Sequence, residues 1–149
     1  MNNKKMQDIK DKYILNDIKE NINSIIGISI LYAYKSADVS ERYLKVLNDI
    51  YKIEFPISFT KELGNSNFEY IEFLYDYLQL PLDDCKWLIP NFNGSNWWVE
   101  LRINNLYNFI NYYYPSNKSL NLTVFDTTNN ILFDIENGED TYEYRIIPL

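Results

Sequence analysis

The sequence predicts an α+β fold with a largely antiparallel sheet and with helices packed mainly on one face. Segments with helical spacing and segments with period-two alternation are mixed along the chain, without a regular βαβ rhythm. The last third, Ser119 to Ile147, has the pattern of a three-stranded antiparallel meander. No internal repeat, linker or low-complexity block divides the chain, so we expect a single domain over residues 1–149.

Three short segments of the meander alternate apolar and polar residues, which is typical of strands with one buried face and one wet face. Because one face of each strand is buried, the pattern also limits which residues can pair across the strands. The apolar positions are Leu120, Leu122 and Val124 in the first segment, Ile131, Phe133 and Ile135 in the second, and Tyr142, Tyr144 and Ile146 in the third.

Both hairpins of the meander have a predicted register. Asn137-Gly138 suits a two-residue type I′ turn, because both central positions of that turn need positive φ. This turn would pair Phe133 with Tyr142, and on the other face it would place Asp134 opposite Thr141.

The earlier hairpin has weaker turn chemistry, and its register is predicted from the matching of buried faces. A Thr128-Asn129 turn would pair Val124 with Phe133 and Leu122 with Ile135. A register one residue away would place Leu122 opposite Asp134, so we reject it.

Before the meander, apolar residues at helical spacing predict helices, and alternating segments predict strands. Asp38 with Glu41 and Ser66 with Glu69 resemble capping boxes and predict the starts of two helices. Pro56 lies within an alternating segment, which favours an edge strand or an extended connection. In order we predict a polar tail over residues 1–5, a helix over about 6–24, a strand over 26–34, a helix over about 39–51, the edge strand Ile53–Phe59, a turn over 60–65, a helix over 67–78, a hairpin of 83–90 and 97–102, and a helix capped by Asn104 and ended by Pro115.

The charge of the chain favours a basic partner. The net charge is −7 and the pI is about 4.6, so a duplex nucleic acid is repelled, and no Lys/Arg-rich block offsets this repulsion. We therefore expect a basic protein partner and no nucleic acid. The apolar stretch Ile25 to Tyr34 is too short to span a bilayer and lies too far from the N-terminus for a signal peptide, so we expect neither a membrane association nor secretion.

Catalytic chemistry is sparse in this sequence. The chain has no histidine, one cysteine and no Gly-rich phosphate loop. The single cysteine, Cys85, cannot form an intrachain disulfide, which fits a reducing, cytoplasmic location. We expect Cys85 to be a buried small hydrophobe and the acidic pair Asp83-Asp84 to be a solvated turn. The sequence thus predicts a protein that is not an enzyme and that uses no cofactor or metal.

The predicted third helix carries the main candidate binding surface. Its carboxylates lie on one helix face, and aromatic residues flank them. Acidic side chains steer and pair with Lys and Arg, while rings supply anchors; the alternative is an ordinary solvated helix face. The chain is also rich in Tyr, which reflects either a recognition surface or codon usage in an AT-rich genome. The predicted partner-binding residues on this helix are Glu69, Glu72, Asp76, Tyr70, Phe73 and Tyr77.

A second candidate is Trp98, at the start of the second strand of the predicted hairpin. If Trp97 points inward, strand alternation turns Trp98 to the other face, where it would be a partly exposed anchor. The alternative is that a helix covers that face too.

The chain resembles, in type, the small immunity proteins that neutralise bacterial toxins, including those of contact-dependent and polymorphic toxin systems. The features that carry the resemblance are a single small acidic domain, the acidic helix residues Glu69, Glu72 and Asp76, and the closing segments Leu122–Asp126 and Ile131–Glu136. The resemblance implies an inhibitor of a toxin and assigns no role to any individual residue.

The sequence therefore predicts an acidic binding protein that neutralises a basic partner, a nuclease-like bacterial toxin, by masking its active site. Three alternatives stay open. One is a phage-type inhibitor of host defence, and another is a small enzyme or ligand-binding domain that uses carboxylates or Tyr hydroxyls. The third is a structural protein that forms a homodimer through the edge of Ile53–Phe59.

Overall fold

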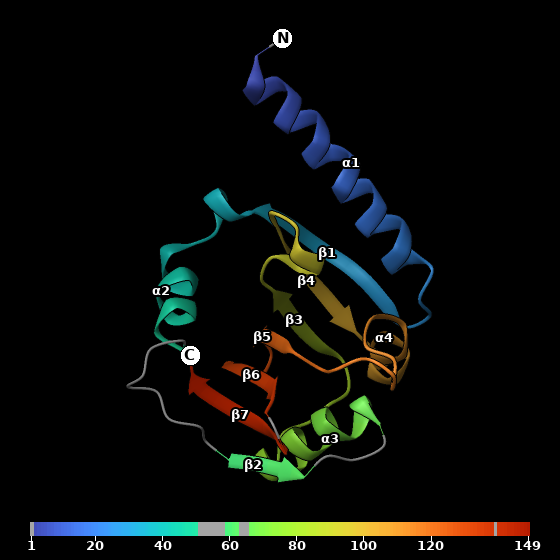
Figure 1. Ribbon diagram of the computed structural model, residues 1–149, viewed down its shortest axis with the longest axis vertical. Helices are drawn as coiled ribbons and strands as arrows, with labels where there is room; N and C mark the ends of the chain where they lie inside the picture. Colours follow the sequence, from blue (N-terminus) through green and yellow to red (C-terminus); the bar gives the residue numbers. More distant parts are fainter. Residues whose placement is uncertain (1, 51–58, 63–65, 139) are drawn as a thin grey trace.

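The computed structural model describes residues 2–50, 59–62, 66–138 and 140–149. Within these residues, seven strands form one antiparallel sheet in the order β1-β4-β3-β5-β6-β7-β2 (Figure 1). The α+β class and the C-terminal meander of β5, β6 and β7 are confirmed. The strands are β1 (Ile28–Lys35), β2 (Phe59–Glu62), β3 (Cys85–Ile89), β4 (Trp97–Ile103), β5 (Leu122–Asp126), β6 (Ile131–Asn137) and β7 (Thr141–Pro148).

The helices cover both faces of the sheet unequally. Buried side chains of α1, α3 and α4 pack into the larger apolar cluster, together with sheet residues such as Trp87 and Phe133. The α2 helix packs on the opposite face, against a smaller cluster that contains Leu88, Phe125 and Leu132. The prediction that the helices lie mainly on one face is therefore confirmed. The helices are α1 (Asn3–Asn23), α2 (Glu41–Ile50), α3 (Asn67–Leu78) and α4 (Leu106–Tyr113), with short 3-10 turns η1 (Ser36–Asp38) and η2 (Phe92–Gly94).

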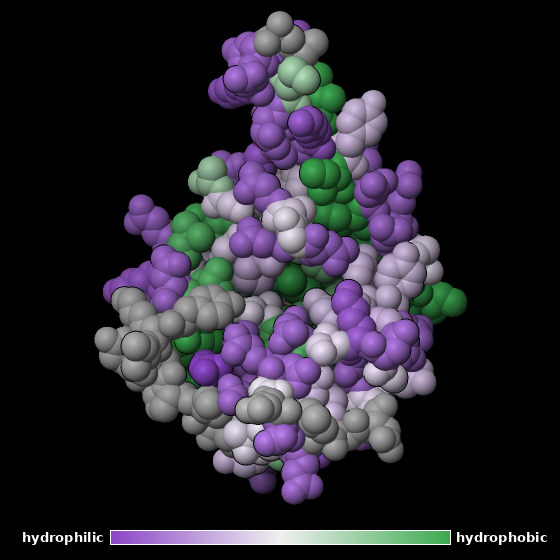
Figure 2. All heavy atoms as spheres, in the orientation of Figure 1, coloured by the Kyte–Doolittle hydropathy of each residue, from purple (hydrophilic) through white to green (hydrophobic). Residues whose placement is uncertain are grey.

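The N-terminal helix extends beyond the sheet. Figure 1 shows α1 projecting from the body, and Figure 2 shows hydrophobic residues reaching the surface along this helix. Met6, Ile9 and Tyr13 are exposed by 46%, 42% and 71%, whereas Ile18 and Ile22 are buried in the main core. The helix begins at Asn3 and Asn2 caps it by accepting from the Lys4 amide at 2.7 Å, so the predicted polar tail is wrong for residues 3–5.

The register of the first hairpin of the meander is confirmed, and that of the second is wrong by four residues. Val124 pairs with Phe133 as predicted, but Phe133 pairs with Ile146 and not with Tyr142. An even shift keeps every side chain on its predicted face. It also places Arg145 opposite the buried Asp134, where Thr141 was predicted.

The loop of this second hairpin is longer than the predicted two-residue turn. Asn137 pairs with Tyr142, so more than two residues separate the paired ends, and the Gly138 amide donates to the Thr141 carbonyl at 2.8 Å. Two favourable pairings, Asp134 with Arg145 and Leu132 with Ile147, accompany the longer loop.

Other boundaries differ in detail. Residues 60–62, predicted as part of a turn, belong to the edge strand β2, which pairs with β7. Most of the predicted strand Ile53–Phe59, including the proposed dimer edge, lies outside the described residues. The α3 helix spans the predicted range, but the Ser66 side chain makes no capping hydrogen bond. Asn105, not Asn104, caps α4 and accepts from the Asn108 amide at 3.0 Å.

Candidate functional site

The α3 helix presents the acidic face that the sequence predicts. Ile71 and Leu74 are fully buried against the sheet, which turns the opposite side of the helix to solvent. Glu69, Glu72 and Asp76 are all exposed on that side. The twelve residues of α3 contain no Lys or Arg, so no basic side chain of the helix itself pairs with these carboxylates.

The three aromatic residues predicted beside the acidic stripe have different environments. Tyr77 is 59% exposed, and its ring centroid lies 6.3 Å from that of Phe73. Phe73 is half-buried, with the Lys61 ammonium 4.7 Å from its ring centroid. Tyr70 is only 3% exposed, and its ring centroid lies 3.9 Å from that of Tyr142.

Tyr70 was therefore wrongly expected at the surface. It precedes the buried Leu74 by one helical turn, so both residues fall on the core side of α3. The apolar stripe of this helix is wider than the sequence analysis assumed, because Tyr75 is also buried.

Trp98 is not an exposed anchor, and that expectation is corrected. Its side chain is 1% exposed and stacks on Phe125, with ring centroids 5.7 Å apart and an interplanar angle of 26°. Alternation along β4 does turn Trp98 away from Trp97, as predicted. However, α2 covers this part of the second face, which is the alternative that the sequence left open.

Cys85 and the Asp83-Asp84 pair match their predicted structural roles. The two aspartates form an exposed turn before β3. Cys85 is 1% exposed, and its thiol donates to the Pro81 and Leu82 carbonyls, at 3.4 Å each. Burial, with the nearby Asp126 charge as a second cause, raises the pKa of the Cys85 thiol to about 12. Such a thiol is a poor nucleophile at neutral pH.

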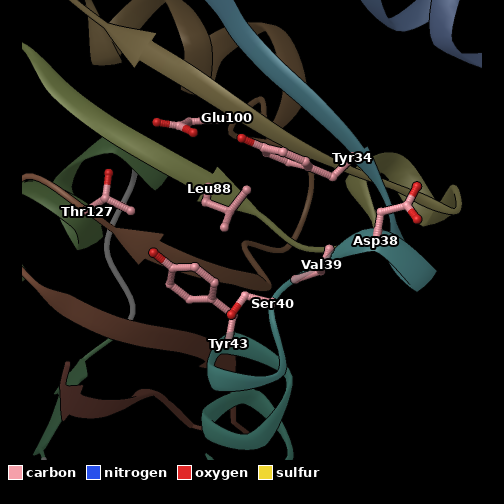
Figure 3. A pocket seen from close by; sticks show the side chains of 8 residues that line it. All are labelled: Tyr34, Asp38, Val39, Ser40, Tyr43, Leu88, Glu100 and Thr127. Carbon is pink, nitrogen blue, oxygen red and sulfur yellow. The ribbon is translucent and has the colours of Figure 1, made fainter.

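A pocket that the sequence analysis missed lies between the second face of the sheet and the N-terminal end of α2. Its volume is about 360 Å³. Figure 3 shows the Glu100 carboxylate and the hydroxyls of Tyr34, Tyr43 and Thr127 around Leu88, which forms the apolar floor. The segment Asp38–Ser40 borders the same pocket.

The pocket could not be recognised from spacing, because its residues come from distant parts of the chain. Tyr34 lies on β1, Leu88 on β3, Glu100 on β4 and Tyr43 on α2. One signal was present: Glu100 is a carboxylate within the otherwise apolar run from Trp97 to Leu101. A charge within such a strand is more informative than an exposed hydrophobic residue.

A cluster of one lysine and two aspartates, of which only Asp11 is buried, joins α1 to the end of β1. The Lys35 ammonium lies 3.3 Å from the Asp11 carboxylate and 3.2 Å from that of Asp8. Hydrogen bonding from Gln7, and then from Lys35, lowers the pKa of Asp11. The Trp97 indole donates to the Asp11 backbone carbonyl at 3.0 Å. These contacts anchor the projecting helix to the sheet and give the cluster a structural role.

A second buried carboxylate, Asp126, is satisfied by a network on the main core side. The Tyr75 hydroxyl donates to it at 2.5 Å and accepts from the Trp87 indole at 3.0 Å. Asp126 also accepts from the Thr128 and Asn129 amides, at 3.0 and 2.9 Å. All of these partners belong to the protein itself, so the network serves the fold.

Asp134 is the third buried carboxylate, and it is less well satisfied. Thr123 donates to one of its oxygens at 2.6 Å, and the Arg145 guanidinium lies 3.8 Å from the other. Burial raises the pKa of Asp134 to about 6, and the hydrogen bond from Thr123 opposes this rise.

Two other features bear on function in the part of the chain that the structure describes. There, His, Cys, Asp and Glu side chains form no group of three or more that could hold a metal ion. None of the described helices combines the length and the apolar character needed to cross a bilayer. A scan against protein-family models finds no match, and searches of curated proteins and of solved structures find no similar protein.

Proposed function

We propose that the protein is a non-enzymatic, acidic binding protein that neutralises a basic protein partner by masking its active site, and that this partner is a nuclease-like bacterial toxin. The observation that supports this proposal is the outer face of α3. It exposes Glu69, Glu72 and Asp76, and the helix carries no basic residue. Tyr77 adds an exposed ring beside them.

Electrostatics favours such a role over nucleic-acid binding. A net charge of −7 repels polyanions and attracts basic surfaces over long range. Complementary charge mainly raises the association rate and makes binding sensitive to salt. A nuclease active site binds a polyanion and is therefore basic, so an acidic helix face complements its surface.

The test reverses the charge of the α3 face. Tagged protein is used to isolate basic partners from the source cell at low salt. The partner is then purified, and the rate at which it associates with this protein is measured. We expect the double variant Glu72→Lys/Asp76→Lys to lower this rate by roughly tenfold or more. We also expect the native protein, but not the variant, to block nuclease activity of the purified partner.

A control with the same change in net charge separates a local effect from a global one. Asp17 and Glu20 are exposed on α1, so Asp17→Lys/Glu20→Lys alters the total charge equally at a different surface. If both double variants slow association to the same extent, or if neither does, the assignment of the α3 face is wrong.

A phage-type inhibitor of host defence would bind its target in the same manner, and the identity of the isolated partner separates the two cases. A second function, a ligand-binding domain, is favoured by a different observation. The hydroxyls of Tyr34 and Tyr43 line a pocket together with Glu100.

A further inference from the structure

We propose that the pocket between α2 and the sheet binds an organic cation, a guanidinium or ammonium group on a short alkyl chain. This pocket is distinct from the α3 face, because Leu88 at its floor belongs to the apolar cluster on the opposite side of the sheet from α3. The proposal therefore goes beyond the protein-binding function and does not depend on it.

The polar groups of the pocket suit a ligand that donates hydrogen bonds. The side-chain oxygens of Glu100, Tyr34 and Tyr43 make no hydrogen bond to another described residue. A carboxylate only accepts hydrogen bonds, whereas a tyrosine hydroxyl can accept or donate. Among the described residues that line the pocket there is no Lys or Arg, so none of them is a cationic partner for Glu100. A cationic donor would satisfy the carboxylate and both hydroxyls.

The aromatic walls of the pocket are held in place by neighbouring rings. Tyr34 stacks on Tyr32 with centroids 6.1 Å apart, and Tyr43 meets Phe125 edge-on at 5.0 Å. Burial, followed by the charge of Glu100, raises the pKa of Tyr34, so its hydroxyl stays neutral at physiological pH. Fixed tyrosine faces attract cations, and positions that are already ordered lose little entropy on binding.

The apolar part of the pocket suits an alkyl chain. Leu88 and Val39 are buried by the surrounding structure, with 5% and 9% exposure. They line the pocket beneath and beside the polar groups, as Figure 3 shows. The volume of about 360 Å³ is near the lower end for ligand pockets, which matches a ligand the size of one amino-acid side chain.

The charges around the pocket do not reverse its preference for a cationic ligand. The N-terminal end of α2 carries a positive partial charge, which Asp38 and Glu41 near that end offset. Arg102 follows Glu100 on the same face of β4, but its guanidinium lies 3.8 Å from Asp84, outside the pocket. Lys86 is exposed and also does not line the pocket.

The experiment compares a cation with a neutral ligand of the same shape. N-acetyl-argininamide and N-acetyl-citrullinamide are titrated into the full-length protein at millimolar concentrations, and binding is followed by amide NMR shifts in β4 and α2. We expect the arginine derivative to bind saturably. We expect the affinity of the citrulline derivative to be lower by roughly tenfold or more. The same titration with a blocked peptide, Gly-Gly-Arg-Gly-Gly, tests an arginine side chain within a protein as the source of the cation.

Two variants locate the binding. Glu100→Gln keeps the side-chain size and removes the charge, and we expect it to weaken arginine binding by roughly tenfold or more. Glu20→Gln, at an exposed position of α1 outside both the pocket and the α3 face, is the matched control and should bind as the native protein does. Because Glu100 does not belong to the α3 surface, loss of partner binding and loss of cation binding are distinguishable.

Each outcome decides the proposal. Binding of the free derivative, lost in Glu100→Gln, supports a small cation as ligand. Binding of the peptide alone supports the side chain of a protein as the source. The proposal is overturned if neither ligand binds, if the citrulline derivative binds equally well, or if Glu100→Gln binds as tightly as the native protein.

Discussion

Replacing Asp134 with Asn should remove a specific pH dependence of stability. Asp134 is 2% exposed, and burial raises its pKa to about 6 from the ordinary 3.8, against the opposing effects of Thr123 and Arg145. The folded protein therefore binds this proton more tightly than the unfolded chain does. The resulting stabilisation is fully present below about pH 3.8 and is lost as the pH rises through about 6.

The magnitude follows from the two pKa values. Their difference corresponds to a maximum of about 3 kcal/mol between acidic and neutral pH. Between pH 7 and pH 5, where only part of this difference is realised, the gain is roughly 1.3 kcal/mol. The variant Asp134→Asn keeps an oxygen acceptor for the Thr123 hydroxyl, and Arg145 keeps Glu136 at 3.2 Å, so the variant should fold.

The assay is urea unfolding of both proteins at pH 7 and at pH 5. Relative to Asp134→Asn, the native protein should become more stable by roughly 1.3 kcal/mol at the lower pH. Asp17→Asn changes an exposed aspartate on α1 and serves as the control, since its difference from the native protein should change little with pH. An unchanged difference between the native protein and Asp134→Asn at the two pH values would refute the reasoning.

Two further predictions concern the main core. Tyr75→Phe leaves the Trp87 indole without its acceptor and removes a donor from Asp126, so we expect the free energy of unfolding to fall by about 2–3 kcal/mol. The control Tyr13→Phe, at an exposed ring, should change the free energy of unfolding by less than about 0.5 kcal/mol. Equal effects of the two substitutions would contradict the role of the network. The Cys85 thiol, with its pKa raised to about 12, should react with iodoacetamide at pH 8 about a thousandfold more slowly in the native protein than in urea; rapid labelling of the native protein would show that the thiol is accessible.

The sequence predicts faces of the sheet better than it predicts registers. In the meander, alternation assigns Phe133 and Tyr144 to the core and Asp134 to the other face, and the structure agrees on all three. Alternation has a period of two, so it cannot distinguish registers that differ by an even number of residues. The Asn137-Gly138 turn chemistry was the only other guide, and cross-strand pairing outweighs it.

The candidate sites also differ in how far local sequence patterns predict them. The acidic stripe of α3 is local, because Glu69, Glu72 and Asp76 follow from helical spacing alone, and the structure exposes all three. The width of the buried stripe depends on what packs against the helix, and for this reason the environment of Tyr70 was missed.

The pocket of Tyr34, Tyr43 and Glu100 depends on tertiary structure more than the buried stripe of α3 does. The pairing of β1 with β4, the coverage by α2 and the bend at Asp38–Ser40 all have to be known before these side chains can be placed together.

The acidic face of α3 and the pocket of Glu100 also differ in how their carboxylates relate to the apolar core. The carboxylates of α3 are solvated and carry no part of the core, so selection on the fold does not explain a helix face that has three acids and no base. Glu100 is different, because it lies on the interior strand β4 between Val99 and Leu101, both fully buried on the other face. An apolar residue at that position would extend the floor formed by Leu88 and would avoid placing a carboxylate beside two tyrosine rings. A cationic ligand would give this carboxylate the partner that the described lining of the pocket does not supply.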